Sequence, residues 1–263
     1  MALPEHVTED ALLGGQVTLR QHAAGYRVAI DPVLLAACVP ALDGETVLDV
    51  GTGVGAAMLC LARRVARAKI TGVEVQRELV HLAIENIAKN GLTDRVAAMV
   101  GDLQRPPPRL APRSFDHVMA NPPYFEAGRV RASAKDERAR ANIEGAGGLG
   151  AWVNYCLSMA RPGGTITMIH RTDRLAELLT LLGDRAGDVV IFPLWPHNPF
   201  ETDDTEEGQA PQAPVASKRV IVQALAGTKG ALRMSAGLVL HKENGDNTRA
   251  ADAILRHGGA LKL

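Results

Sequence analysis

Residues 48–55 read Leu48-Asp49-Val50-Gly51-Thr52-Gly53-Val54-Gly55. This segment begins as a short apolar strand, passes through three alternating glycines and leads into a stretch, residues 55–67, whose apolar residues recur at helical spacing. Glycines at such a turn let a ligand approach the backbone closely, and the amide groups at the start of the following helix face that ligand. The segment therefore predicts a strand, a tight turn and a helix that together bind a ligand.

From residue 46 onwards, short apolar segments alternate with longer amphipathic ones. Strands are expected at residues 46–50, 69–75, 95–100, 115–120, 164–170, 188–195 and 218–226, with helices at 55–67, 76–90, 149–160 and 174–182. About seven strands with intervening helices predict an α/β fold: a Rossmann-like, mostly parallel, doubly wound sheet with helices on both faces. In such a sheet, ligands bind at the carboxyl ends of the strands.

Three parts are expected along the chain. Residues 1–43 should form a β-hairpin from residues 15–20 and 26–30, then a short helix that begins at Asp31-Pro32, the whole covering cofactor and substrate. Residues 44–226 should form the α/β domain, and residues 227–263 an extension packed on it. Within the domain, residues 197–215 have no periodic apolar face, which predicts an acidic mobile insertion.

The composition excludes several classes of protein. The 263 residues carry 29 basic and 29 acidic side chains and are 46% hydrophobic, as in an ordinary globular protein. Neither a signal peptide nor an apolar run near the roughly 18 residues needed to cross a bilayer is present. The three cysteines, Cys38, Cys60 and Cys156, lie far apart, which argues against a disulfide framework and a zinc site. We expect a cytoplasmic protein without a metal.

Acidic residues lie at or just after the carboxyl ends of the first three strands of the predicted sheet. Asp49 precedes the glycines, where its carboxylate could receive the ammonium group of a methionine. Asp102 follows the third strand, where it could accept a hydrogen bond from an adenine amine, and Glu74 ends the second strand near the expected ribose hydroxyls. This pattern favours S-adenosylmethionine (SAM) over NAD. Because Ala56 also completes the GxGxx(G/A) spacing, and Glu74 suits both cofactors, an NAD-dependent oxidoreductase stays an alternative.

The motif Asn121-Pro122-Pro123-Tyr124 directly follows the fourth strand. An exocyclic amine on an aromatic ring is a poor nucleophile because its lone pair is delocalised into the ring. Hydrogen bonds from that amine to the Asn121 side-chain oxygen and the Pro122 carbonyl would favour a tetrahedral nitrogen and free the lone pair. The two prolines hold φ near about −65° and stiffen this loop, and Tyr124 offers a stacking face. The motif predicts methyl transfer to nitrogen, with positioning as the main source of rate.

Together, these motifs resemble the class I SAM-dependent methyltransferases, in which (D/N)PP(Y/F) marks enzymes that methylate planar amide or exocyclic amino nitrogens. The segment from Thr18 to Ala36, together with residues 218–222 and 238–241, is similar to the tRNA1(Val) adenine-N6 methyltransferases, which methylate the adenine at position 37, next to the anticodon. The resemblance extends over nearly the whole chain. It implies SAM as the cofactor, tRNA as the partner, and no obligate protein partner.

The resemblance also implies a set of site residues. Those expected to bind the cofactor are Arg27, Asp31, Asp49, Gly51, Gly53, Gly55, Glu74, Val75, Asp102 and Leu103. Those expected to hold the target amine are Asn121, Pro122, Pro123 and Tyr124.

Three further functions fit the same motifs. The amine could belong to a guanine (N2) in rRNA, or it could be the side-chain amide (N5) of a protein glutamine. Enzymes of the latter kind grip their target with an extra helical N-terminal domain, which this chain does not show. The third is a SAM-binding module without catalysis, against which the intact Asn121 and Tyr124 argue.

Two charged segments leave the mode of RNA binding open. The first follows the Asn121–Tyr124 motif and is either a solvated face or a clamp for RNA phosphates: Arg129, Arg131, Lys135, Arg138 and Arg140. The second, residues 197–215, contains five acidic residues and no lysine or arginine, and either is merely solvated or repels RNA until displaced. Since the rest of the chain then has a net charge of +5, overall neutrality does not exclude an RNA substrate.

Overall fold

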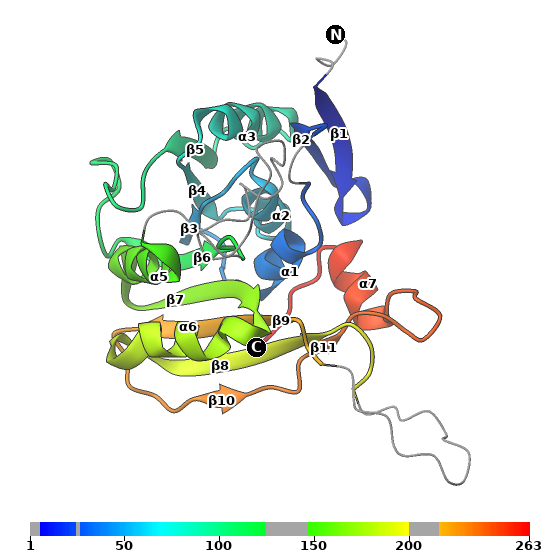
Figure 1. The fold of residues 1–263 in the computed structure, drawn as a ribbon. Helices are drawn as coiled ribbons and strands as arrows, with labels where there is room; N and C mark the ends of the chain where they lie inside the picture. The colour runs from blue at the N-terminus through cyan, green and yellow to red at the C-terminus, as the bar shows by residue number, and fades with distance from the viewer. Residues whose placement is uncertain (1–5, 25–26, 125–146, 200–215) are drawn as a thin grey trace.

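A computed structural model of the chain describes residues 6–24, 27–124, 147–199 and 216–263. Within these ranges a nine-stranded sheet crosses the molecule in the order β10-β8-β9-β7-β6-β3-β4-β5, with β11 also paired to β8 (Figure 1). The strands are β3 Thr46–Val50, β4 Lys69–Glu74, β5 Val96–Val100, β6 Phe115–Ala120, β7 Ala160–Arg171, β8 Ala186–Trp195, β9 Arg219–Ala226, β10 Arg233–Met234 and β11 Leu238–Val239.

The directions of the strands confirm the predicted fold class. All neighbouring pairs from β5 to β7 are parallel, and β9 runs antiparallel between β7 and β8. The sheet is larger than the seven strands predicted because β10 and β11 pair with the outer edge of β8. Each is two residues long, too short to show an alternating pattern in the sequence.

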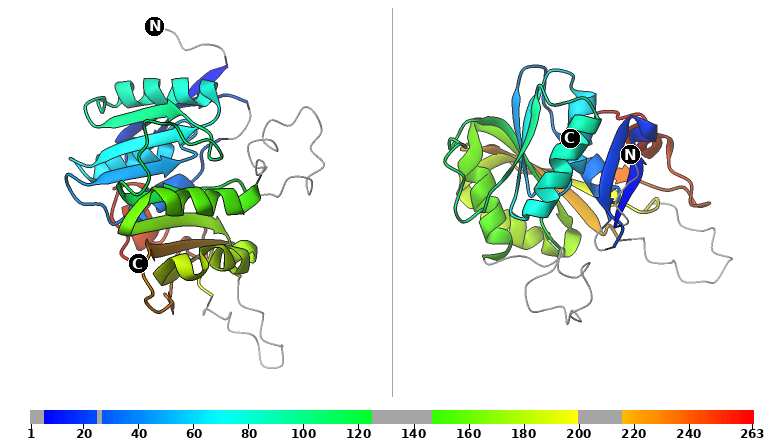
Figure 2. Two further views of the ribbon diagram at one scale, coloured as in Figure 1. Left: turned by 90° about the vertical axis from the view of Figure 1, so that its left-hand side faces the viewer. Right: turned by 90° about the horizontal axis from the view of Figure 1, so that it is seen from above.

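Helices cover both faces of the sheet (Figure 2). They are α1 Asp31–Cys38, α2 Ala56–Arg64, α3 Arg77–Lys89, α5 Gly148–Met159, α6 Leu175–Leu182 and α7 Arg249–Leu255. Apolar side chains of α1, α2, α3 and α7 share one buried cluster, whereas those of α5 and α6 belong to a second. The two clusters make the three-layer arrangement typical of a doubly wound sheet.

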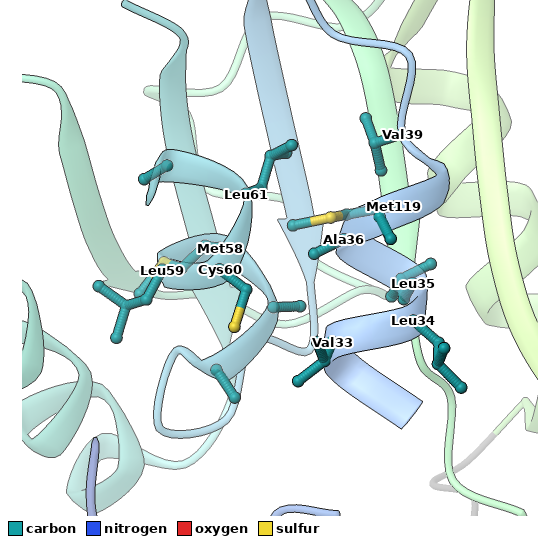
Figure 3. Packing of buried hydrophobic residues seen from close by; sticks show 14 of the residues in the cluster. Val33, Leu34, Leu35, Ala36, Val39, Met58, Leu59, Cys60, Leu61 and Met119 are labelled. Carbon is teal, nitrogen blue, oxygen red and sulfur yellow. The ribbon is translucent and has the colours of Figure 1, made fainter. Parts of the chain in front are cut away.

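The packing of α1 against α2 holds the end of the glycine-rich segment in place. Leu34 and Leu35 of α1 and Met58 and Leu59 of α2 are fully buried, and Met119 of β6 lies between the two helices (Figure 3). Burying each such side chain stabilises the fold by about 1.5–3 kcal/mol. Because α2 begins directly after Gly55, this core fixes where its first amide groups point.

The N-terminal hairpin exists, but one of its strands was predicted wrongly. β1 Val7–Leu12 pairs antiparallel with β2 Val17–His22, whereas residues 27–30 form no strand. The expected first strand, residues 15–20, overlaps β2, so its partner precedes it in the chain. The pairing brings Glu9 opposite Arg20, and the two form an ion pair, with 3.4 Å between Arg20 Nε and Glu9 Oε2. Opposite charges across β1 and β2 favour this pairing, whereas the alternating apolar and polar residues of 26–30 do not lead to a strand.

The asparagine Asn86 ties the hairpin to the core. Its side chain, from α3, is completely buried; Oδ1 accepts from the Arg20 amide at 2.7 Å, and Nδ2 donates to the carbonyls of Arg20 and Val54, each at 2.9 Å. Since Val54 belongs to the glycine-rich segment, one side chain joins the hairpin, α3 and that segment. The sequence contains no local signal for this role.

In the parts of the chain that the structure describes, no helix is long and apolar enough to cross a membrane. The three cysteines are buried and unpaired.

Candidate active site

Most of the predicted site residues lie at the carboxyl ends of strands or on the loops that follow them. Val50 of β3 pairs with Val73 of β4 and with Ala120 of β6, and Glu74 pairs with Val100 of β5. These strands are parallel and in close register, so the loops that follow them begin side by side. The glycine-rich segment, Glu74, Asp102 and the Asn121–Tyr124 motif thus come to the same edge, where ligands bind in doubly wound folds.

Asp49 holds the turn after β3 together. It is 2% exposed, and its Oδ2 accepts from the Thr52 hydroxyl at 2.6 Å. Burial raises the pKa of Asp49 to about 6, although the hydrogen bond from Thr52 opposes the shift. Contact between this carboxylate and a methionine ammonium stays a prediction.

The three glycines of the turn meet different surroundings. Gly51 has φ +70°, and a Cβ there would lie 2.2 Å from the ring of Trp152 in α5. Gly55, at φ +93°, precedes α2 and would crowd the end of the Met58 side chain. Gly53, at φ +57°, has no atom within 4 Å of the same position among the described residues. The backbone is therefore open to a ligand at Gly53, whereas the Trp152 ring packs against it at Gly51.

The contact between Trp152 and Gly51 has no counterpart in the sequence analysis. The Trp152 side chain is half-buried, whereas Tyr155 of the same helix is 3% exposed, as expected for a core residue. Helical periodicity indicates that both residues face inwards, but it does not indicate that one of them reaches the turn after β3.

Glu74 connects the turns after β3 and β4. It is 7% exposed; its Oε2 accepts from the Gly53 amide at 3.2 Å, and its Oε1 from the Gln76 amide at 2.9 Å. Burial raises its pKa, and these amides oppose the shift. Each carboxylate oxygen has a further lone pair that could accept from a hydroxyl.

An apolar surface lies beside this carboxylate. Val75 is 60% exposed, which is unusual for a valine directly after a central strand. Leu103, after β5, is half-buried, and exposed Asp102 accepts from the Gln104 amide at 2.9 Å. Open backbone at Gly53, the Glu74 acceptors and exposed apolar side chains fit the adenosine part of SAM. The individual contacts stay predictions.

Tyr124 lies at the centre of a polar cluster at the end of β6. It is 9% exposed, and its hydroxyl donates to the carboxylate of Asp31, the first residue of α1. The same hydroxyl lies 3.0 Å from Asn121 Oδ1. Asn121 is half-buried and Pro122 is buried, so this loop is packed against the protein.

Two residues that the sequence analysis did not assign complete the cluster. Arg219 Nε donates to Asp31 Oδ2 at 3.1 Å, and the guanidinium carbon lies 4.3 Å from the centroid of the Tyr124 ring. His170 approaches that ring edge-on, with 5.6 Å between centroids and 86° between planes. Burial and the charge of Arg174 lower the pKa of His170 to about 4, so the ring is neutral at pH 7. The signal for Arg219 was topological: β9 runs antiparallel and so begins at the carboxyl end of β7, opposite Arg171.

The structure separates Arg27 from Asp31. Arg27 forms an ion pair with Asp10 of the hairpin, with 2.6 Å between Nη2 and Oδ1, whereas Asp31 contacts Tyr124 and Arg219. Cofactor contacts for both stay predictions. Tyr26, the basic residues between 129 and 140, and residues 200–215 of the acidic segment lie outside the described residues.

In the described part of the chain, no group of three or more histidine, cysteine, aspartate or glutamate side chains could hold a metal ion.

Fold and sequence comparisons agree with this arrangement. Residues 26–151 match the family described as "Methyltransferase small domain". Among solved structures, a predicted O-methyltransferase of Agrobacterium tumefaciens superposes with a TM-score of 0.69 at 22% identity, covering 89% of this chain and 99% of that one. Pyrococcus horikoshii TYW2 in complex with MeSAdo gives a TM-score of 0.53 at 15% identity, covering 86% and 73%. The chain therefore has the fold of class I SAM-dependent methyltransferases, and its residues 26–151 are similar to the methyltransferase small domain.

Curated proteins with similar sequences indicate which members of this class the chain resembles. A tRNA1(Val) (adenine(37)-N6)-methyltransferase of Shewanella halifaxensis is 31% identical over 158 residues, 60% of this chain and 63% of the relative. The protein of the same name from Salmonella arizonae is 37% identical over 115 residues, 43% and 46% of the two chains. Within its class, the chain resembles the tRNA1(Val) adenine-N6 methyltransferases, as its motifs predicted. These matches span less than two thirds of each relative, and are narrower than the resemblance over nearly the whole chain that the motifs predicted.

Proposed function

We propose that this protein transfers the methyl group of SAM to N6 of an adenine in tRNA, most specifically adenine 37 of tRNA1(Val). The observation that carries the proposal is the position of Asn121-Pro122-Pro123-Tyr124 at the carboxyl end of β6, beside the open glycine turn that follows β3. The names of the curated relatives support the choice of tRNA.

Two residues of the motif act directly on the target amine in this proposal. The Asn121 side-chain oxygen and the Pro122 carbonyl accept hydrogen bonds from the two hydrogens of the target amine, which frees the nitrogen lone pair. Bound SAM would supply an electrophilic methyl group on its sulfonium sulfur. No strong general base is needed, since alignment of the nitrogen supplies most of the rate, and the methylated nitrogen would release its extra proton to water after the transfer.

The target base must leave its stack to reach this site. N6 of a stacked adenine cannot be approached along the line required for methyl transfer, so the base turns out into the pocket. The anticodon loop, with its bases already partly unpaired, makes this less costly than a duplex would. Tyr124 would offer its ring to the base, but Arg219 lies over that ring here, so stacking on that face requires Arg219 to move.

The test is incubation of the protein with labelled SAM and unmodified tRNA1(Val), followed by nucleoside mass spectrometry. We expect N6-methyladenosine in this transcript and none in a matched transcript with guanine at position 37. Transfer to guanine N2 of rRNA or to a protein glutamine would instead support the alternative functions. Tight binding of SAM without transfer to RNA or protein would point to a non-catalytic module, and tight binding of NADH without SAM binding to an oxidoreductase.

A further inference from the structure

The Tyr124 hydroxyl faces two acceptors with a single proton. It donates to the Asp31 carboxylate, and it also lies 3.0 Å from Asn121 Oδ1. An ionised carboxylate and an amide oxygen both only accept hydrogen bonds. The proton can satisfy one of these contacts, and the other then brings two oxygens together without a hydrogen.

The charge at Asp31 decides which contact holds the proton. Hydrogen bonds to an ionised acceptor are roughly twice as strong as those between neutral groups. Arg219 Nε, 3.1 Å from Asp31 Oδ2, places a positive charge that matches an ionised carboxylate. The Tyr124 hydroxyl therefore donates its hydrogen bond to Asp31. The phenol oxygen then acts as an acceptor through its lone pairs, and a hydrogen bond with Arg219 is one of its contacts.

The remaining contact, between the Tyr124 oxygen and Asn121 Oδ1, becomes a hydrogen bond if the Asn121 side-chain amide is rotated by half a turn, so that its nitrogen and oxygen exchange places. The oxygen and nitrogen of an asparagine side chain have nearly the same shape, and their assignment follows from the hydrogen bonds around them. With Nδ2 towards Tyr124, the amide donates to the phenol oxygen, and Oδ1 points away from it. Every contact in the chain Arg219, Asp31, Tyr124 and Asn121 then joins a donor to an acceptor.

We infer that Asp31 is a positioning residue for the reaction. By accepting the hydrogen bond from the Tyr124 hydroxyl, it makes the phenol oxygen an acceptor towards Asn121. That oxygen then holds the Asn121 NH2 group, and Asn121 Oδ1 is available to the target amine. In the opposite orientation, the amine would meet the Asn121 NH2 group, and two donors would face each other. The inference rests on the proposed function for its catalytic meaning, and it differs from a cofactor contact by Asp31.

A double-mutant cycle tests whether Asp31 acts through the Tyr124 hydroxyl. The variants are Asp31→Asn, Tyr124→Phe and the double variant, each assayed for kcat and for the Kd of SAM. We expect each single variant to lose at least about tenfold in kcat, the double variant to lose no more than the worse single one, and SAM affinity to stay within about twofold. Multiplying losses in the double variant would overturn the inference. So would weaker SAM binding by Asp31→Asn with unchanged kcat, which would indicate a cofactor contact instead.

A second measurement does not depend on activity. The side-chain NH2 resonances of Asn121, identified by their absence in Asn121→Asp, report solvent exchange by NMR. We expect exchange to accelerate in both Asp31→Asn and Tyr124→Phe. The NH2 group of Asn154, whose Oδ1 accepts from Arg185 in an exposed contact, should exchange equally in all variants.

The outcomes separate the inference from the proposed function. Unchanged Asn121 exchange in Asp31→Asn would overturn the inference, whether or not the enzyme methylates tRNA. Faster exchange in a protein that methylates no RNA would contradict the proposed function and leave the orientation of Asn121 supported. If Asp31→Asn does not fold, Tyr124→Phe removes only the hydroxyl and tests the same link: unchanged exchange there overturns the inference.

Discussion

The guanidinium of Arg219 lies over the ring of Tyr124, with 4.3 Å between its central carbon and the ring centroid. The first residue of β9 thus packs against the last residue of the Asn121–Tyr124 motif, although the two are distant in sequence. Because Arg219 also bonds Asp31, it combines a stacked and a paired contact in a partly buried place.

Replacing Arg219 with lysine should therefore destabilise the protein. Lysine keeps the charge but loses the planar stack, and we expect the free energy of unfolding to fall by about 1 kcal/mol in urea titrations. The matched control is Arg161→Lys: Arg161 pairs with Asp116 at 2.8 Å but its side chain is 53% exposed. There the change should stay under about 0.5 kcal/mol. Equal losses would mean that the stack contributes nothing.

Gly51→Ala should cost much more than Gly91→Ala. The two glycines have nearly the same φ, +70° and +66°, but a Cβ at position 51 would lie 2.2 Å from Trp152, whereas position 91 has no described atom within 4 Å. We expect Gly91→Ala to lose about 1 kcal/mol of unfolding free energy from the backbone alone. Gly51→Ala should lose about 1–3 kcal/mol more from the clash and should weaken SAM binding. Similar losses would show that Trp152 moves aside freely.

Asp49 should make stability depend on pH in a defined direction. Its pKa is about 6 in the folded protein, against 3.8 in the unfolded chain. The raised pKa means that the contribution is fully present below pH 3.8 and is lost as the pH rises through about 6. Relative to Asp49→Asn, the native protein should lose up to about 3 kcal/mol of unfolding free energy over this range, and no more above it. Urea titrations of both proteins from pH 4 to pH 7 would measure the difference, and a constant difference would contradict it.

The same group offers a test of cofactor binding. If ionised Asp49 receives the methionine ammonium, SAM affinity measured by calorimetry should fall as the pH drops below about 6. Asp49→Asn should bind SAM more weakly and show a smaller pH dependence in this range. If native protein and variant show the same pH profile, Asp49 only holds the turn.

Asn121→Ala should separate binding from turnover. The side chain is expected to act on the amine, so we predict a loss of at least about a hundredfold in kcat with SAM affinity within about twofold of the native value. Asn154→Ala, at an exposed position on α5, is the matched control and should change neither quantity. Loss of SAM affinity in Asn121→Ala equal to the loss of turnover would contradict the assigned role.

Much of the fold could be predicted because its elements have local causes. The apolar strand β3, the glycines after it and the periodic face of α2 are adjacent in sequence, and each element was placed within a few residues of its observed bounds. The order of strands and helices then fixed the class of fold, and with it the edge at which the glycine turn, Glu74 and the Asn121 motif meet.

Other parts depend on partners that are far away in the chain. The hairpin strand before β2 was missed because its polar residues find complementary ones only after pairing. The contact of Trp152 with Gly51 likewise depends on how α5 lies across the end of β3.

The sequence by itself determined the class of fold, the glycine turn and the motif that could hold an amine, because each depends on residues that are adjacent or close together in the chain. Only the tertiary structure decided that Asp31 and Arg219 surround Tyr124, across separations of 93 positions between Asp31 and Tyr124 and 188 between Asp31 and Arg219. The physical reason is that these contacts require α1 to pack beside β6 and β9 to enter the sheet antiparallel. Both depend on burying the whole core rather than on any local pattern.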